Sequence, residues 1–130
     1  MATSKGIILL IEDDAFVAGM YSTKLSVLGY TVRVASDGEE GWRMLTSEST
    51  PDLLLLDLVL PRKDGFEILR DARKEPKLRS LPIILLTNLG QKSDVEKGLE
   101  LGADDYIIKA HFTPSEVVER IEKALRERKK

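Results

Sequence analysis

The sequence of 130 residues contains no cysteine and one histidine, and aromatic residues make up only 5% of it. Without cysteine the chain forms no disulfide and no thiolate metal site, which suits a reducing compartment. A net charge of -2 gives no electrostatic argument for binding nucleic acid. The N-terminal segment MATSKGIILLIEDD has a short apolar run broken by three acids, so it predicts neither a signal peptide nor a membrane span. We therefore expect a cytoplasmic location and no membrane partner.

Hydrophobic residues make up 42% of the chain and charged residues 32%, which is an ordinary balance for a globular protein. The length fits one domain with a true hydrophobic core. We expect a single domain over residues 1–130, with its core at about residues 5–125. Residues 126–130 either prolong the last helix or begin a linker.

Short apolar runs alternate with amphipathic stretches along the whole sequence. The runs lack polar alternation, which is typical of parallel strands covered on both faces. They predict strands over residues 7–11, 30–34, 53–56, 82–86 and 106–108. The stretches between them predict helices over residues 15–28, 37–47, 65–74, 93–101 and 113–128. This order predicts an α/β fold, a doubly wound parallel sheet of five strands with helices on both faces.

The stretch PDLLLLDLVLPRKDG places an acid directly after the most apolar run of the chain. Four leucines, residues 53–56, are followed by Asp57. A buried carboxylate is costly unless it is paired, hydrogen-bonded or bound to a metal. Asp57 is therefore either a solvent-facing turn residue or a group placed there for chemistry.

The other predicted strands also end in residues that can carry chemistry. Acids at residues 12–14 follow the first strand, Thr87 the fourth and Lys109 the fifth. In doubly wound sheets ligands bind at this carboxyl edge, where these residues would meet. Clustered carboxylates repel one another unless a cation joins them, and an oxygen-only ligand set suits Mg²⁺. With Asp57 as nucleophile, a hydroxyl and an ammonium nearby would favour formation of an aspartyl phosphate.

The segments LLIEDD, PDLLLLDLVLPRKDGFEIL, PIILLTN and GADDYIIK, in this order and spacing, resemble the response-regulator receiver domains of two-component signalling. The resemblance covers roughly residues 5–125. It implies the flavodoxin-like, CheY-like fold with strand order 2-1-3-4-5. It also implies that a sensor histidine kinase or a phosphotransfer protein donates a phosphoryl group to the chain.

The resemblance implies a role for each matching residue. Asp57 would accept the phosphoryl group, and Thr87 and Lys109 would contact it. Asp13 would bind Mg²⁺ directly and Glu12 through water, with Asp57 and the backbone carbonyl of Val59 completing the protein ligands. Tyr106 would change rotamer on activation together with Thr87. The surface formed by residues 93–101, 106–108 and 113–128 would then bind a downstream protein or an output domain outside this sequence.

Three positions depart from the family pattern. Members commonly have a cis proline after the lysine, whereas Ala110 follows Lys109 here and the loop is one residue longer. A cis bond before alanine costs several kcal/mol more than one before proline, so a different loop is expected. Asn88 is larger than the usual residue beside Thr87. Members that dimerise often pair a basic residue with a glutamate; Glu116 matches the glutamate, but Val95 occupies the basic position.

The amino-acid sequence leaves two alternatives to a phosphorylation switch open. The first is a receiver-like interaction module that does not use phosphorylation. The second is a phosphohydrolase of the haloacid-dehalogenase kind, which needs a second aspartate two residues after the nucleophile. Val59 stands there and cannot donate a proton. We therefore expect no substrate-turning enzyme, only self-phosphorylation and slow self-dephosphorylation.

Overall fold

The computed structural model describes residues 4–47 and 49–128, which form five strands and five helices in strict alternation. The strands are β1 (Ile7–Ile11), β2 (Thr31–Ala35), β3 (Leu53–Leu56), β4 (Ile83–Thr87) and β5 (Asp105–Ile108). The helices are α1 (Ala15–Val27), α2 (Gly38–Ser47), α3 (Gly65–Lys74), α4 (Lys92–Glu100) and α5 (Pro114–Arg128). Short 3₁₀ turns occupy Pro76–Leu78 and Lys109–His111.

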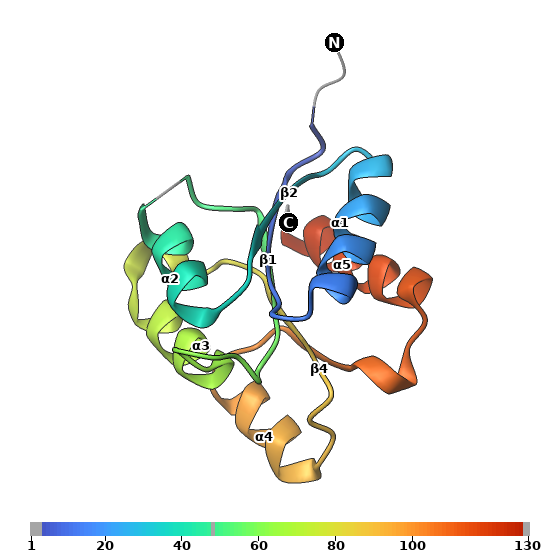
Figure 1. The fold of residues 1–130 in the computed structure, drawn as a ribbon. Coiled ribbons are helices and arrows are strands. Elements are labelled where there is room, and N and C mark those ends of the chain that lie inside the picture. The colour runs from blue at the N-terminus through green and yellow to red at the C-terminus, as the bar shows by residue number, and fades with distance from the viewer. Residues whose placement is uncertain (1–3, 48, 129–130) are drawn as a thin grey trace.

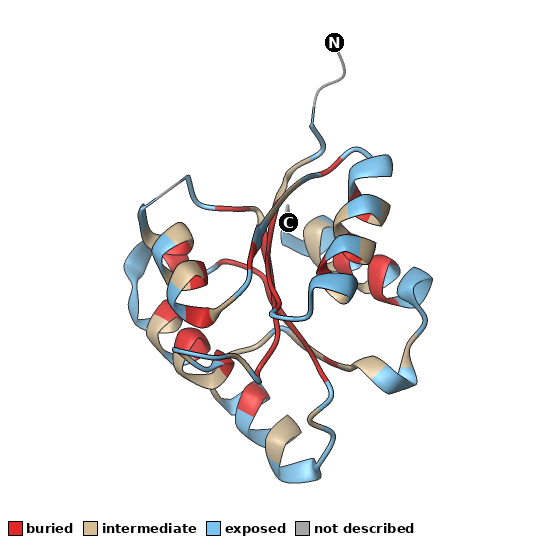
Figure 2. Ribbon diagram, viewed as in Figure 1, coloured by how far each residue is buried: buried red, intermediate tan, exposed pale blue. Residues whose placement is uncertain are grey.

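The five strands form one parallel sheet in the order β2-β1-β3-β4-β5. The predicted fold class and strand order are therefore confirmed. β3 lies at the centre, paired with β1 on one side and β4 on the other. Its four leucines are completely buried, because helices cover both faces of the sheet (Figure 2).

Helices α1 and α5 cover one face of the sheet, and α2, α3 and α4 lie on the other side (Figure 1). Successive residues of a strand point to opposite faces, so each central strand contributes to two cores. Ile8, Leu10, Leu53 and Leu55 pack in the core under α1 and α5. The core on the opposite face contains Leu9, Ile11, Leu54 and Leu56.

The helix ends follow the local signals in the sequence. Asp14 caps α1, because its Oδ1 accepts hydrogen bonds from the N–H groups of Phe16 at 2.9 Å and Val17 at 3.2 Å. At α5, Thr113 Oγ1 accepts from the Glu116 N–H at 3.2 Å, and Glu116 Oε1 accepts from the Thr113 N–H at 2.8 Å. This reciprocal pair is a capping box, so Glu116 has a local structural role in this chain.

Several predicted boundaries are wrong by one or two residues. The second strand begins at Thr31, because the Tyr30 N–H donates to Leu25 O at 3.1 Å and so closes α1. β4 begins after Pro82 and runs through Thr87. β5 begins at Asp105, which pairs with Ile84 although its polar side chain breaks the apolar pattern.

The helix boundaries differ in the same way. α1, α2, α4 and α5 begin or end within one residue of the predicted positions, and α3 has the predicted bounds. α5 runs to Arg128, so residues 126–128 of the tail prolong this helix. Residues 129–130 of that tail lie outside the described residues. No described helix is long and apolar enough to cross a membrane.

Candidate functional site

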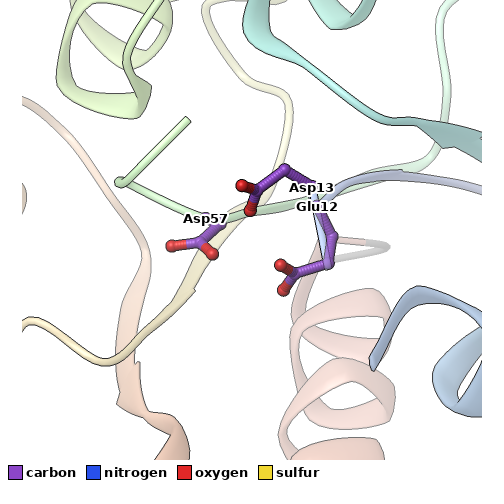
Figure 3. A group of neighbouring side chains, drawn as sticks. All are labelled: Glu12, Asp13 and Asp57. Carbon is purple, nitrogen blue, oxygen red and sulfur yellow. The ribbon is translucent and has the colours of Figure 1, made fainter. Parts of the chain in front are cut away.

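Three carboxylates meet at the carboxyl edge of the sheet (Figure 3). One oxygen each from Glu12, Asp13 and Asp57 lies within 4.8 Å of the others. The strand register explains this, because Ile11 of β1 lies beside Leu56 of β3 and both strands end there. The next residues, Glu12 and Asp57, are therefore neighbours; both are buried, whereas Asp13 is exposed.

Lys109 reaches this acidic group from the end of β5. Its Nζ lies 3.0 Å from Asp57 Oδ2 and 2.7 Å from Glu12 Oε1. Burial lowers the pKa of Lys109, but its contacts with the two carboxylates outweigh burial, and the net pKa is raised above 10.5. The residues after Lys109 form the 3₁₀ turn, and none of the described peptide bonds is cis. The non-proline loop thus leaves Lys109 beside Asp57.

Glu12 is almost fully buried, and its two oxygens differ in their partners. Oε2 accepts a hydrogen bond from the Asp14 N–H at 3.1 Å. Oε1 has no partner among the described residues apart from its ion pair with Lys109. Burial raises the pKa of Glu12 above 4.5, although the contacts to Lys109 and Asp14 act in the opposite direction.

Thr87 and Tyr106 are linked through the backbone of one residue, Leu89, in the loop between β4 and α4. Thr87 is fully buried at the end of β4, and its Oγ1 accepts from the Leu89 N–H at 3.3 Å. The Tyr106 hydroxyl donates to Leu89 O at 2.6 Å. Burial raises the pKa of Tyr106 to about 12, with smaller contributions from Asp94 and Asp57. The amino-acid sequence gives no indication of this role of Leu89, because its contacts are made by backbone atoms.

The loop after β3, residues 58–64, begins at the acidic group. The Val59 N–H donates to Asp57 Oδ1 at 3.2 Å, while the Val59 side chain is 57% exposed. The loop ends at Asp64, which caps α3 through a hydrogen bond from the Glu67 N–H at 3.0 Å. Val59 is therefore tied directly to Asp57 through its backbone.

The donor atoms at this edge fit a hard divalent cation. Three carboxylates face one ammonium, so the group keeps a net negative charge when all four are ionised. Oxygen ligands with no nitrogen or sulfur donor suit Mg²⁺, which needs only one or two carboxylates and keeps several waters. The exposed carboxylate of Asp13 gives the site an open side. The residues present therefore fit Mg²⁺.

Two further residues lie away from this group. The single histidine, His111, is exposed. Trp42 is half-buried and packs against the core under α2 and α3. The Lys63 Nζ also lies 4.8 Å from the Trp42 ring centroid, a contact between α2 and the loop before α3 that the sequence did not indicate.

A parallel sheet of this order with an acidic group at its carboxyl edge is the arrangement of CheY-like proteins. The sequence model described as "Response regulator receiver domain" matches residues 8–122. The chain therefore belongs to the receiver domain family of two-component response regulators. A "response regulator receiver domain protein (CheY-like)" from Methanospirillum hungatei is similar in structure, with a TM-score of 0.87, 29% identity and 95% of each chain covered.

Two curated relatives are named as transcriptional regulators. The "Probable transcriptional regulator ycf27" of Porphyridium aerugineum is 45% identical over 119 residues, which are 92% of this chain and 48% of the relative. The "DNA-binding dual master transcriptional regulator RpaA" of Synechocystis sp. is 39% identical over 119 residues, again 92% of this chain and 48% of the relative. The chain thus spans about half the length of these relatives.

Proposed function

We propose that this chain is a phosphorylation switch in which Asp57 accepts a phosphoryl group from a sensor histidine kinase or a phosphotransfer protein. The observation that carries the proposal is the position of Asp57. Its carboxylate is buried at the end of the central strand, 3.0 Å from Lys109 Nζ, and shares an oxygen cluster with Glu12 and Asp13. A nucleophile, a cation and further acids at one strand edge are the groups that phosphoryl transfer requires.

In the proposed reaction a carboxylate oxygen of Asp57 attacks the phosphorus atom of the donor phosphohistidine. A bond forms between oxygen and phosphorus, and the bond between phosphorus and nitrogen breaks. The donor imidazole leaves with the bonding electrons and takes up a proton. Lys109 offers a positive charge to the transferred group, and the hydroxyl of Thr87 donates to one of its oxygens. Water later hydrolyses the acyl phosphate and regenerates Asp57.

Four groups of this chain would hold Mg²⁺: the carboxylates of Glu12, Asp13 and Asp57 and the backbone carbonyl of Val59. When bound, Mg²⁺ would neutralise and orient the phosphoryl oxygens. Support for this assignment comes from the cluster of carboxylate oxygens within 4.8 Å and from the hydrogen bond between Val59 and Asp57. The rest of the charge compensation comes from Lys109.

The new charge on Asp57 would change the surface formed by α4, β5 and α5. A phosphoryl oxygen would accept from the Thr87 hydroxyl and draw this side chain towards Asp57, away from the Leu89 N–H that donates to its Oγ1. Since Tyr106 is bound to the same residue, a shift of Leu89 changes the position of both side chains. The phosphoryl group shifts the equilibrium between two surface states only by the difference between its interaction free energies with them. A downstream protein would recognise one of the two surface states. In a longer protein of the relatives' length, an output domain would do so.

The test is intact mass after incubation with phosphoramidate, with and without Mg²⁺. We compare the wild type with Asp57→Asn, and use Asp94→Asn on α4 as a matched control. We expect one Mg²⁺-dependent phosphoryl adduct in the wild type and the control, and none in Asp57→Asn. An equal yield of adduct in Asp57→Asn would overturn the assignment. No adduct in any protein would favour the phosphorylation-independent module, and turnover of a phosphomonoester would favour the hydrolase.

A further inference from the structure

The loop of residues 58–64 contains a strained turn close to Asp57. Arg62 has a φ of 73°, the single positive value among the described residues other than glycine. The Lys63 N–H donates to Pro61 O at 2.9 Å, so the turn is closed by a bond between residues two apart. Such a conformation is unfavourable for a residue with a Cβ and persists only when its surroundings hold it.

The first turn of α2 supplies this support. The Gly38 N–H donates to Pro61 O at 3.1 Å, on one side of the strained residue. On its other side, a Cβ built on Gly38 would lie 1.6 Å from Lys63 O and 2.6 Å from the Lys63 carbonyl carbon. Arg62 itself forms an ion pair with Asp37, at 3.2 Å between Nε and Oδ2. Gly38 of α2 and Asp37, the residue before the helix, together contact all three residues of the turn.

Further contacts fix the rest of the loop. The Lys63 ammonium lies over the Trp42 ring of α2 and also binds Asp71 of α3, with 2.7 Å between Nζ and Oδ2. Where the loop enters α3, the Gly65 N–H donates to Leu58 O at 2.9 Å. At the other end, the Val59 N–H binds Asp57 Oδ1. The turn and the Val59 backbone therefore belong to one short loop whose two ends are fixed by hydrogen bonds.

We propose that Gly38 is a positioning residue for the loop of residues 58–64, and through it for the Mg²⁺ site at Asp57 and Val59. The inference rests on the proposed function, because it takes that metal site as given. A side chain at residue 38 would force α2 and Lys63 O apart by roughly 1.5 Å or more, since atoms in contact lie more than 3 Å apart. The loop would then move without any change in the ligands themselves.

The first experiment measures the Mg²⁺ dissociation constant of Gly38→Ala by calorimetry. Gly19→Ala is the matched control, because a Cβ on that α1 glycine meets no atom within 4 Å. Val118→Ala, which truncates a buried residue of α5, controls for general loss of stability. We expect Gly38→Ala to weaken Mg²⁺ binding about 10- to 100-fold, as changes to groups that orient metal ligands do. Both controls should bind as the wild type does.

A second measurement uses the wild type, so that it stands even if Gly38→Ala does not fold. Coupling between sites is reciprocal, so Mg²⁺ bound at the loop must stabilise the bond from the Gly38 N–H to Pro61 O. Amide hydrogen exchange at Gly38 should slow when Mg²⁺ saturates the protein. The Tyr30 amide, bound to Leu25 O at the end of α1, should not change.

The outcomes separate the inference from the proposed function. If the wild type binds no Mg²⁺, the metal site itself is wrong and the inference falls with it. Two results would contradict the inference alone. One is that the wild type and Gly38→Ala bind Mg²⁺ equally well. The other is that the rate of amide hydrogen exchange at Gly38 does not change when the wild type binds Mg²⁺. If Val118→Ala weakens Mg²⁺ binding as much as Gly38→Ala does, the inference is also wrong, because the loss of affinity would then come from the loss of stability alone.

Discussion

The sheet carries a largely buried cation at each end, and the two are bound in different ways. Lys109, at the carboxyl edge, has a side chain 17% exposed, and its contacts are with the carboxylates of Glu12 and Asp57. Arg73, in the last turn of α3, has a side chain 18% exposed. Its guanidinium donates to the Asp104 carboxylate and to the backbone oxygens of Leu78, Arg79, Leu81 and Gly102.

This difference distinguishes Arg73, a structural cation, from Lys109, a cation in the candidate functional site. Apart from the Asp104 carboxylate, the partners of Arg73 are backbone carbonyls, which cannot titrate or move independently of the chain, so Arg73 joins the loops before β4 and β5 through fixed groups. The partners of Lys109 are carboxylate side chains, which can be protonated and which, in the proposed function, would bind Mg²⁺ and, at Asp57, accept a phosphoryl group. A cation whose partners are replaceable can respond to a ligand.

Arg73→Met should cause the largest loss of stability. It leaves several carbonyl oxygens near Gly102 and Leu81 without their donor, and each unsatisfied buried group is costly. We expect the free energy of unfolding to fall by about 2–4 kcal/mol, measured by urea denaturation. Arg79→Met, an exposed arginine on the same edge, should change it by less than about 0.5 kcal/mol. Equal losses in both variants would contradict a fixed role for Arg73.

Lys109→Met should cost less, and Mg²⁺ should reverse most of the loss. Without the ammonium, Glu12 and Asp57 repel each other, and we expect a loss of roughly 1–3 kcal/mol in metal-free buffer. A cation that binds the folded chain restores stability by mass action. Urea denaturation with and without saturating Mg²⁺ should therefore show a larger Mg²⁺ effect in this variant than in the wild type or Arg73→Met. The same increment in all three proteins would show that Lys109 and the metal do not share partners.

Glu12→Gln should have the smallest effect, visible as a pH dependence. Burial raises the pKa of Glu12 above 4.5, so the folded chain binds more protons than the unfolded chain between 4.5 and the raised pKa. Stability must fall as the pH rises through this window. In metal-free buffer the wild type should therefore lose stability relative to Glu12→Gln as the pH increases from about 4. The exposed Glu39→Gln is the control, and parallel curves for all three proteins would refute the effect.

The fold was predictable because its strands are unambiguous. The leucines of β3 lack polar alternation, and only a strand covered on both faces accommodates such a run in a chain of this length. Errors occurred where tertiary contacts decide the boundary. Tyr30 closes α1, and Asp105 joins β5 while its carboxylate binds Arg120 at 2.6 Å. Neither contact leaves a local signal in the sequence.

The candidate site was predictable where its residues end strands. Glu12, Asp57 and Lys109 were placed together because parallel strands bring their carboxyl ends to one edge. Contacts through the backbone could not be predicted, as with Leu89 and the carbonyl partners of Arg73. Gly38 did carry a signal. Glycine is a poor helix former, and its presence in the first turn of α2 suggests that another part of the chain approaches closely.

The central position of β3 explains why four leucines precede Asp57. A central strand hydrogen-bonded on both sides and sealed from water is among the last parts of a protein to open, so the amides of Leu54 to Leu56 should exchange with solvent only on global unfolding. Asp57 is therefore attached to a strand that is held on both sides and on both faces. In the proposed switch, the strand would not move to relieve the charge added at Asp57, and the surrounding loops would move instead.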